Sequence, residues 1–272
     1  MRLRSVSGWN YAGGAFLRSS RSDEFRTEAG QANAADILRK HEIDGLVPIG
    51  GDGTFHGAVE LARHWSGQIV GCPGTIDNDL MGSDFTIGFS TAVETAVEAV
   101  DKIRDTAESH ERMFLVEVMG RHSGFIALHT AIAAGAEIVC VPELPTEMDV
   151  ICDYLTLLKQ RNKSSVMMIV AEGDEGGGAD AIRIQLESSE CPFSTRTVIL
   201  GHLQRGGSPT PEDRILGNQL GLWAVEALTD GKTGIMIGRV GGAQKQTTFP
   251  DTFAEHKPLP PELLRLVNVL GR

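Results

Sequence analysis

The sequence predicts an α/β protein with two lobes, each built on a mostly parallel sheet. Apolar runs of strand length alternate with segments of helical spacing along most of the 272 residues. Glycine-rich turns follow several of these runs, and the chain contains 32 glycines but few aromatic residues. Strands that alternate with helices in this way are typical of βαβ units, whose parallel strands end at the same edge of a sheet.

The clearest βαβ unit begins with an apolar run at 45–49, which leads into the turn 49–54 with the sequence IGGDGT. A segment of helical spacing at 55–63 follows. A second apolar run, 68–72, then leads into the turn 73–79 with the sequence PGTIDND. We therefore expect both turns at the same edge of a parallel sheet, where open α/β sheets bind their ligands.

These two turns place small residues beside aspartates. Small residues in the first turn allow backbone N–H groups to approach a phosphate, and the N-terminus of the next helix adds a favourable dipole. Aspartates beside such a cradle are expected to bind Mg²⁺ or to act as a base, because bare carboxylates repel phosphate. The alternative is that IGGDGT forms only a tight turn and that the later aspartates cap helices. The pairing of both turns in one βαβ unit favours the phosphate site.

The remaining elements are predicted from periodicity and turn residues. Residues 1–30 are expected to be loop-like. Helices are expected at 31–42, 91–107, 149–159 and 214–228, and strands at 113–118, 137–141, 165–170, 196–200 and 235–238. The apolar stretch 125–141 is expected to be a buried helix followed by a strand, not a membrane span. A closing helix is expected after the prolines at 258, 260 and 261.

Composition narrows the classes of partner. The formal net charge of −11 argues against nucleic acid or an anionic membrane as the main partner. Cys72, Cys140, Cys152 and Cys191 have no C-x-x-C spacing, so we expect reduced structural cysteines in a cytoplasmic protein. No signal-peptide pattern is seen at the start of the sequence. An anionic small substrate would therefore need local arginines.

Five basic side chains lie at or next to predicted turns at strand ends: Arg112, Arg121, Arg196, His202 and Arg205. Each alone is more typical of a surface charge. Together, in an acidic chain, they indicate a pocket for a phosphorylated substrate, because guanidinium groups match the geometry of phosphate. Two further arginines, Arg21 and Arg26, lie beside serines near the N-terminus, where they are either a phosphate clamp or solvated charge.

Four motifs resemble those of the 6-phosphofructokinase family in order and spacing. They are IGGDGT at 49–54, PGTIDND at 73–79, MGR at 119–121 and GHLQRGGSP at 201–209. The likeness runs from about Gly13 to Leu228. The first turn alone is shared with NAD kinases and diacylglycerol kinases, whereas the second and last motifs are far more specific to this family.

The resemblance implies a two-lobed, three-layer αβα fold. A nucleotide-binding lobe is expected at residues 1–88 and 204–254, and a sugar-phosphate-binding lobe at residues 89–203 and 255–272. The implied enzyme is a glycolytic kinase, dependent on Mg²⁺ and ATP, that phosphorylates the 1-hydroxyl of fructose 6-phosphate. The implied assembly is a homo-oligomer in the cytoplasm, a dimer or a tetramer, with neither nucleic acid nor membrane as a partner.

The resemblance also implies roles for single residues. Asp77 matches the base that accepts the proton of the sugar's 1-hydroxyl, and Thr75, Asp79 and Arg121 complete the implied catalytic set. The implied substrate-binding residues are Thr75, Ile76, Asp77, Arg112, Met119, Gly120, Arg121, Glu172, Arg196, His202, Leu203, Gln204 and Arg205. The implied nucleotide-binding residues are Arg21, Arg26, Gly51, Asp52, Gly53 and Thr54, with Asp52 also associated with Mg²⁺. Arg112 and Arg196 match arginines that the family supplies from a neighbouring subunit.

Two glycines bear on the phosphoryl donor. Diphosphate-using members of the family typically carry Asp and Lys at the positions of Gly53 and Gly74. An aspartate at position 53 would crowd and repel the α-phosphate of a nucleotide, whereas a lysine at position 74 would favour diphosphate. Gly53 and Gly74 therefore favour ATP, with a diphosphate-using relative as the alternative.

The sequence departs from the family pattern at its N-terminus. The family begins with a strand and a first Gly-Gly-Asp turn upstream of the point where this sequence starts, and nothing in residues 1–30 replaces them. We expect a fragment or a misplaced start rather than a natural short form, because the other catalytic positions are intact. A non-catalytic or impaired subunit that binds sugar phosphate is the alternative.

Overall fold

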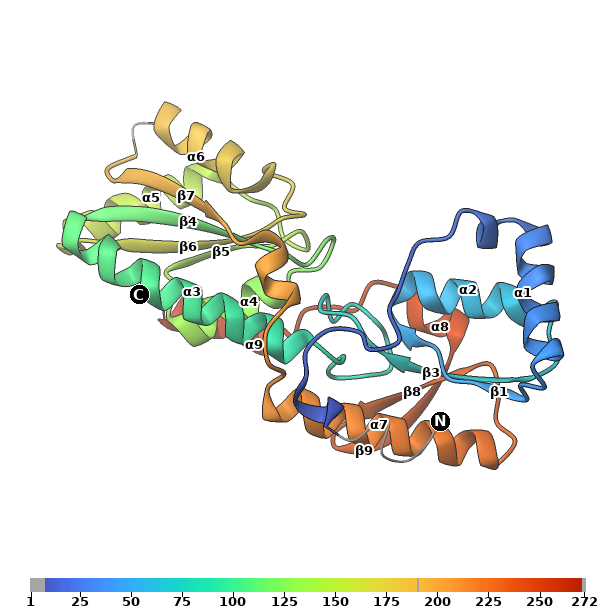
Figure 1. The fold of residues 1–272 in the computed structure, drawn as a ribbon. Helices are drawn as coiled ribbons and strands as arrows, with labels where there is room; N and C mark the ends of the chain where they lie inside the picture. The colour runs from blue at the N-terminus through green and yellow to red at the C-terminus, as the bar shows by residue number, and fades with distance from the viewer. Residues whose placement is uncertain (1–7, 190, 271–272) are drawn as a thin grey trace. The chain divides into compact units, whose positions relative to one another are not determined.

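The computed structural model describes residues 8–189 and 191–270, which form two compact units (Figure 1). Unit 1 contains residues 8–75, 79–90 and 208–257, and unit 2 contains residues 76–78, 91–207 and 258–270. Each unit has its own sheet. The chain passes from one unit to the other within the turn 73–79, so the residues of this motif belong to both units.

In unit 1, the strand β3 (Gln68–Pro73) lies inside the sheet. β1 (Gly45–Leu46) and β2 (Ile49–Gly50) pair with it in parallel, and so does β8 (Ile235–Val240). β9 (Ala243–Thr248) pairs with β8 in the antiparallel sense, and its presence was not expected from the sequence. The sheet of unit 1 is therefore mostly parallel, with one antiparallel edge.

The predicted strand at 45–49 is interrupted in the structure. Pro48 has no backbone N–H to donate to the ladder, and the chain divides there into β1 and β2. The carbonyl of Pro48 still accepts a hydrogen bond from Cys72 N at 3.0 Å. The turn 49–54 consequently remains in register with the carboxyl end of β3.

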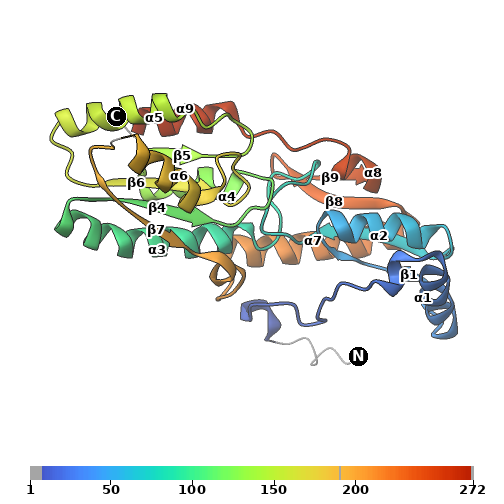
Figure 2. The ribbon, with the colours of Figure 1, turned by 90° about the horizontal axis from the view of Figure 1, so that it is seen from above.

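Helices cover both faces of this sheet (Figures 1 and 2). α1 (Glu28–Lys40), α2 (Asp52–Ala62) and the short α8 (Phe249–Phe253) share one hydrophobic core, in which the rings of Phe55 and Phe249 stack with centroids 5.1 Å apart. α7 (Pro211–Thr229) packs Leu216 and Leu220 against the other face of β3 and β8. The parallel strands are thus shielded from water on both sides.

The described part of the N-terminal segment is loop with two short 3₁₀ helices, η2 (Trp9–Tyr11) and η3 (Glu24–Arg26). α1 begins at Glu28, three residues earlier than predicted. The reason is an N-cap, because Thr27 Oγ1 accepts a hydrogen bond from Gly30 N at 3.1 Å.

Unit 2 has a four-stranded sheet in the order β5-β6-β4-β7, and every pair in it is parallel. The strands are β4 (Arg112–Val118), β5 (Ile138–Cys140), β6 (Val166–Ala171) and β7 (Ser194–Ile199). All six residues of β6 are buried, as expected for a parallel strand that is covered on both faces. The carboxyl ends of these strands therefore meet at one edge of the unit.

Helices lie on both faces of the unit 2 sheet (Figure 1). α5 (Met148–Gln160) and α6 (Gly178–Ser188) lie on one face, and α3 (Phe89–His110), α4 (Phe125–Ala134) and α9 (Pro261–Leu270) lie on the other. α6 was not predicted, because the glycine run at 176–178 is typical of a loop. A final 3₁₀ turn, η4 (Gly201–Arg205), follows β7.

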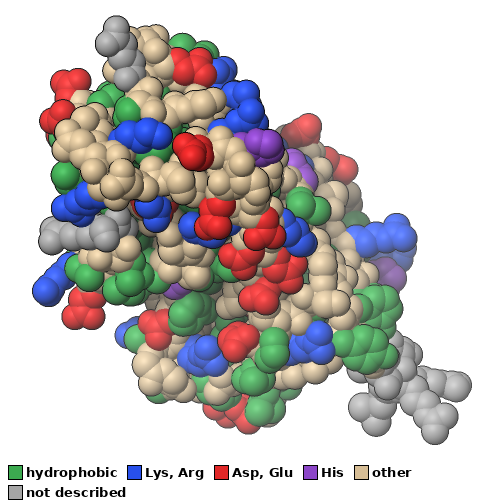
Figure 3. Space-filling model, turned by 90° about the vertical axis from the view of Figure 1, so that its left-hand side faces the viewer, with side chains coloured by type: hydrophobic (Ala, Val, Ile, Leu, Met, Phe, Trp, Pro, Cys, Tyr) green, Lys and Arg blue, Asp and Glu red, His purple; other side chains and the backbone are tan. Residues whose placement is uncertain are grey.

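The described residues include no helix that is both long and apolar enough to cross a membrane. On the face drawn in Figure 3, basic side chains are scattered among acidic ones instead of forming one broad basic surface. This distribution agrees with the negative net charge.

Gly71 in β3 lies beneath two phenylalanine rings. A Cβ at this position would lie 2.5 Å from a ring carbon of Phe55 and 2.8 Å from one of Phe249. We expect Gly71→Ala to lower the free energy of unfolding by about 1–3 kcal/mol through overpacking. Gly221→Ala on α7, where a Cβ meets no atom within 4 Å, should raise it by about 0.5–1 kcal/mol. Denaturant unfolding measures both, and equal stability of the two variants would contradict the packing described.

Candidate functional site

The turn 49–54 of unit 1 becomes the N-terminus of α2. Gly51 is the N-cap residue, and its carbonyl accepts hydrogen bonds from the backbone N–H groups of Thr54 and Phe55. Amide groups in the first turn of a helix lack intrahelical acceptors and carry the positive end of the helix dipole. The predicted phosphate-binding turn is therefore positioned as an anion site.

Two glycines of this turn differ in what they allow. A Cβ at Gly50 would lie 2.2 Å from Thr54 Oγ1, so the fold itself excludes a side chain there. A Cβ at Gly53 would meet no atom within 4 Å. The packing of this chain thus gives no reason for glycine at position 53, and the open space leaves room for a ligand.

Asp52 is the first residue of α2. Its Oδ1 accepts no hydrogen bond within the described part of the chain, and His56 Nε2 lies 3.0 Å away. The imidazole forms an ion pair with this oxygen only when it is protonated. No group of three His, Cys, Asp or Glu side chains that could hold a metal occurs among the described residues. Mg²⁺ is commonly held by one or two carboxylates together with substrate phosphates, and Asp52 fits that mode.

The turn 73–79 is held by side chains from both of its flanks. In unit 1, Thr86 Oγ1 donates a hydrogen bond to the carbonyl of Thr75 at 2.6 Å. In unit 2, Ser123 Oγ donates to the carbonyl of Asp77 at 2.8 Å. Asn78 has a left-handed backbone with φ of 52°. The backbone of this turn is therefore fixed by hydroxyl groups at Thr75 and at Asp77.

The turn after β4 gathers predicted residues from three neighbouring strands of unit 2. Met119 N donates to Gln204 Oε1 at 2.8 Å, and Arg121 N donates to Glu172 Oε1 at 2.7 Å. Gln204 lies in η4, after β7, and Glu172 follows β6 directly. Ser123, which also lies in the turn after β4, bonds the carbonyl of Asp77. The predicted sugar-contacting segments therefore converge at the carboxyl edge of the sheet.

Close backbone contacts make this convergence possible. A Cβ at Gly173 would lie 1.8 Å from the carbonyl oxygen of Arg121, so only glycine allows the segment after β6 to reach this turn. Gly120 has φ of 148°, and a Cβ there would lie 2.3 Å from the carbonyl oxygen of Ser123. Arg121 is itself left-handed, with φ of 58°.

The predicted residues of η4 are not equally accessible. His202, Leu203 and Arg205 are exposed, whereas Gln204 is buried, with 1% of its surface accessible. Gln204 Nε2 has no hydrogen-bond partner among the described residues. The side chain of Gln204 consequently supports the turn after β4, while its neighbours remain available to a ligand.

Arg112 and Arg196 do not join this group within the chain. Arg112 begins β4, and Arg196 is the third residue of β7, paired with Phe114. The seven residues of β4 span about 20 Å at 3.3 Å per residue, so both arginines lie toward the amino edge of the sheet. Arg112 lies at the start of a strand next to a turn, as expected, whereas Arg196 lies inside β7, because β7 starts two residues earlier than predicted.

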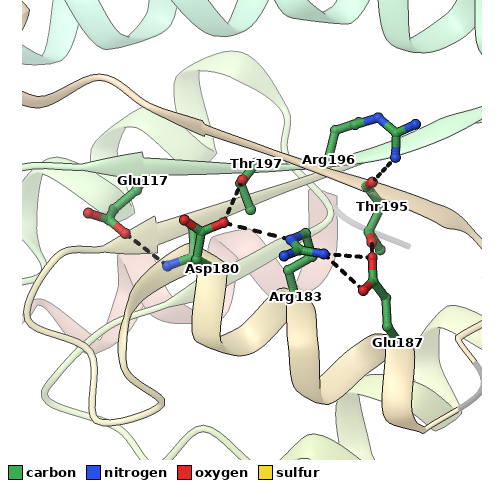
Figure 4. Close-up of polar contacts among 8 residues, drawn as sticks. Glu117, Asp180, Arg183, Glu187, Thr195, Arg196 and Thr197 are labelled. Atoms are coloured by element: carbon green, nitrogen blue, oxygen red, sulfur yellow. Dashed lines mark hydrogen bonds and ion pairs between the residues drawn. The ribbon is translucent and has the colours of Figure 1, made fainter.

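A ladder of polar contacts fixes the face from which Arg196 projects (Figure 4). Thr195 Oγ1 donates to Glu187 at 2.9 Å and Thr197 Oγ1 to Asp180 at 2.7 Å, so alternate residues of β7 face α6. Arg183 lies between these carboxylates and bonds Glu187 at 2.8 Å. Hydrogen bonds from Thr195, then from Arg183, lower the pKa of Glu187. Side chains alternate along a strand, and Arg196 therefore projects from the opposite face.

Arg21 and Arg26 are exposed in the N-terminal segment of unit 1. Arg26 Nε lies 4.0 Å from Asp23, a distance at which a solvated pair contributes little. Phe25, beside Arg26, packs against α2, where a Cβ at Gly57 would lie 3.2 Å from its ring. This contact places Arg26 close to the helix whose N-terminus is the candidate phosphate site.

Comparison with known proteins agrees with these motifs. The family model for Phosphofructokinase matches residues 1–228. The chain is 48% identical over 269 residues to ATP-dependent 6-phosphofructokinase 1 of Thermus thermophilus, a match that covers 99% of this chain and 83% of that protein. It is 45% identical to ATP-dependent 6-phosphofructokinase of Cytophaga hutchinsonii, with 98% and 82% covered. The chain belongs to the phosphofructokinase family.

The fold of this family member also matches a solved structure. Phosphofructokinase from Saccharomyces cerevisiae superposes with a TM-score of 0.85 at 29% identity. The match covers 93% of this chain and 38% of the yeast chain, so this chain spans less than two-fifths of that protein's length. The predicted α/β phosphofructokinase-like fold class is confirmed.

Two of the four cysteines, Cys72 and Cys140, are buried. Burial raises the pKa of Cys72 and of Cys140 to about 12, and Asp174 adds to the effect at Cys140. A thiol with such a pKa stays protonated near neutral pH and is a poor nucleophile. These two cysteines are core residues.

Sequence reasoning did not single out Ser123 and Gly173. Ser123 lies two residues after a motif arginine, and Gly173 directly follows Glu172. Their proximity to predicted residues was the available signal, but only the folded chain shows which backbone atoms they support.

We expect Gln204→Met to destabilise the fold although the two side chains have similar size. Methionine cannot accept the hydrogen bond of Met119 N–H in the way that the amide does, and the buried donor is left without a good partner. The expected loss is about 1–3 kcal/mol of unfolding free energy. Gln160→Met, at the exposed end of α5, is the matched control. Thermal and denaturant unfolding compare the two, and a loss no larger than the control's would argue against this contact.

Proposed function

We propose that this chain transfers the γ-phosphoryl group of ATP to the 1-hydroxyl of fructose 6-phosphate, giving fructose 1,6-bisphosphate and ADP, the committed step of glycolysis. The observation that carries the proposal is the hydrogen-bonded group at the carboxyl edge of unit 2. There the carbonyl of Asp77, the turn 119–121, Glu172 and Gln204 are joined through Ser123 and two backbone N–H groups. The named relatives at 48% and 45% identity support the same reaction.

Asp77 acts as the general base in this proposal. It accepts the proton of the 1-hydroxyl as that oxygen attacks the γ-phosphorus and the bond to the leaving ADP breaks. Phosphoryl transfer needs alignment and charge neutralisation more than covalent work by the protein. The hydrogen bond from Ser123 to the carbonyl of Asp77 supports the role by fixing the backbone that carries the carboxylate.

The acceptor is bound by the side chains around this turn. Met119, Gly120, Arg121 and Glu172 contact the sugar, and His202 and Arg205 contact the 6-phosphate. The exposure of His202 and Arg205 at the carboxyl edge supports this assignment, and guanidinium forks suit phosphate. Gln204 supports the turn after β4 through its hydrogen bond from Met119 N. Ile76 and Leu203 lie in the segments that bind the acceptor.

The donor is bound at the N-terminus of α2. The turn 51–54 takes the phosphates, chiefly through the backbone N–H groups of Gly51, Asp52 and Gly53, with Arg21 and Arg26 supplying positive charge nearby. Asp52 would hold Mg²⁺, which when bound neutralises charge on the β- and γ-phosphates. Thr75 and Asp79 complete the transfer site.

Arg112 and Arg196 serve the substrate of a neighbouring subunit in this proposal, so the working enzyme is a homo-oligomer, a dimer or a tetramer, in the cytoplasm. Their position on the amino half of the unit 2 sheet supports a role away from the turn after β4 of their own chain. Arg196 is exposed, as this role requires.

We expect the purified 272-residue chain to release ADP from Mg-ATP only when fructose 6-phosphate is present. Asp77→Asn should lower kcat by roughly 10²–10⁴-fold, the usual range for loss of a general base. Asp153→Asn, on the exposed face of α5, is the matched control and should leave kcat unchanged. Near-full turnover by Asp77→Asn would remove Asp77 from the mechanism. No ADP release, with fructose 6-phosphate still raising Tm, would indicate a sugar-phosphate-binding subunit.

Gly53→Asp tests the choice of donor. The open space at Gly53 accepts a side chain without clash, so the variant should fold. We expect KM for ATP to rise by roughly tenfold or more, because a carboxylate at this position repels the nucleotide phosphates. Gly53→Ala adds bulk without charge and serves as the control. Steady-state kinetics with ATP and with diphosphate measure the change, and an unaltered KM for ATP would contradict the role given to Gly53.

A further inference from the structure

Unit 1 holds the segment that follows Asp79 against its C-terminal elements. Met81 N donates to the carbonyl of Thr252 in α8 at 3.0 Å. Asp84 N donates to the carbonyl of Arg239 in β8 at 2.8 Å, and Asp84 Oδ2 accepts from Gly241 N at 2.7 Å. Asp79, which the proposed function places at the transfer site, thus begins a loop whose shape depends on residues 157 positions later in the chain.

Close packing leaves this loop little freedom. A Cβ at Gly82 would lie 2.1 Å from Thr247 Oγ1 in β9, and a Cβ at Gly238 in β8 would lie 2.1 Å from the carbonyl oxygen of Gly82. Ser83 Oγ donates to the carbonyl of Phe85 at 2.7 Å and accepts from Arg239 N at 3.1 Å. The loop is therefore bound closely to the β8–β9 hairpin.

Lys257 supplies a cation to this loop. Its Nζ donates a hydrogen bond to the carbonyl of Asp84 at 2.9 Å, and the carboxylates of Asp84 and Asp79 both act on the ammonium. The guanidinium of Arg239 bonds Gln219 of α7 instead. Lys257 is half-buried and is the last residue of unit 1 before the chain enters unit 2.

We propose that Lys257 is a positioning residue for phosphoryl transfer, whose ammonium anchors the loop 79–84 and supplies positive charge that favours the ionised form of Asp79. The inference rests on the proposed function, because the role of Asp79 comes from it. A half-buried cation acts on neighbouring carboxylates through a lower effective dielectric than an exposed one, so its charge is felt more strongly. Removing it should raise the cost of ionising Asp79.

The charge state of Lys257 predicts a signature in the pH profile. Burial lowers the pKa of Lys257 from 10.5 to about 8, an effect that Asp84 and Asp79 partly oppose. The ammonium is therefore mostly present at pH 7 and is lost as the pH rises through about 8. Arginine keeps its charge throughout this range.

The test compares four variants of the full chain by steady-state kinetics from about pH 5.5 to about pH 9.5, which spans both limbs of the profile. Lys257→Met removes the charge, and Lys257→Gln removes the charge but keeps a donor for the carbonyl of Asp84. Lys257→Arg keeps a permanent charge. Lys245→Met, on the exposed strand β9 of the same unit, is the matched control.

We expect Lys257→Met and Lys257→Gln to lower kcat by roughly tenfold at pH 7, with KM for fructose 6-phosphate changed by less than about twofold. Their acid limb should move to higher pH by about half a unit or more, because Asp79 loses the positive charge that favours its ionised form. Lys257→Arg should retain activity at pH 9, where the wild type declines. Lys245→Met should match the wild type at every pH.

Three results would overturn the inference. One is a Lys257→Met profile that coincides with the wild type. Another is full activity in Lys257→Gln, which would reduce Lys257 to a hydrogen-bond donor. A third is equal loss in the Met, Gln and Arg variants together with a lower Tm and an unmoved pH profile, which would indicate a purely structural role.

Equilibrium unfolding gives a readout that does not need activity. Because the pKa of Lys257 is lower in the folded than in the unfolded chain, the unfolded state binds more protons between pH about 8 and 10.5. The contribution of Lys257 to the free energy of unfolding should therefore increase with pH across this window. We expect this increase in Lys245→Met and not in Lys257→Met. If the wild type is inactive but the two variants still differ in the pH dependence of unfolding, the result counts against the proposed function only. If the wild type is active but the two variants do not differ, the result counts against the burial of the ammonium, and so against the inference.

Discussion

The parallel pairing of β4 with β6 and β7 is the constraint on which the carboxyl edge of unit 2 depends. All three strands run in the same direction, so the segments that follow them leave the sheet at one edge. There the N–H groups of Met119 and Arg121 bond side chains that lie 85 and 51 residues away. Backbone amides of one turn thus fix the positions of Gln204 and Glu172, and the proposed substrate-binding segments are held together by contacts within the protein.

Glycines have two separate roles in this family member. Gly50, Gly120 and Gly173 are excluded from carrying a side chain by atoms of the protein itself, with a Cβ placed at 2.3 Å or closer to a neighbour. Gly53 has no such neighbour, because a Cβ there would meet no atom within 4 Å. Glycines that look alike in a motif therefore differ in the space around them, and the donor role proposed for Gly53 is a separate question from packing.

Much of the fold followed from local pattern, and the exceptions have physical causes. The periodicity of apolar residues located most helices and strands, because buried faces repeat every two or 3.6 residues. α6 was missed because of the glycine run at its start, and β9 because all but one of its residues are exposed and it carries no apolar alternation. Arg196 was expected at the start of a strand, whereas β7 begins at Ser194 and the hydroxyl group of Thr195 donates a hydrogen bond to Glu187 of α6.

The sequence by itself determined the order of elements, the family and the candidate residues of the two acidic and glycine-rich turns, because these depend on neighbours within a few positions. Only the tertiary structure decided which candidates point outward and which support the backbone, as Gln204 and His202 show within one 3₁₀ turn. It also brought Lys257 to the loop after Asp79. There Lys257 bonds the carbonyl of Asp84, a residue 173 positions earlier in the chain. Such contacts depend on how separate strands and helices pack, and no local periodicity encodes that packing.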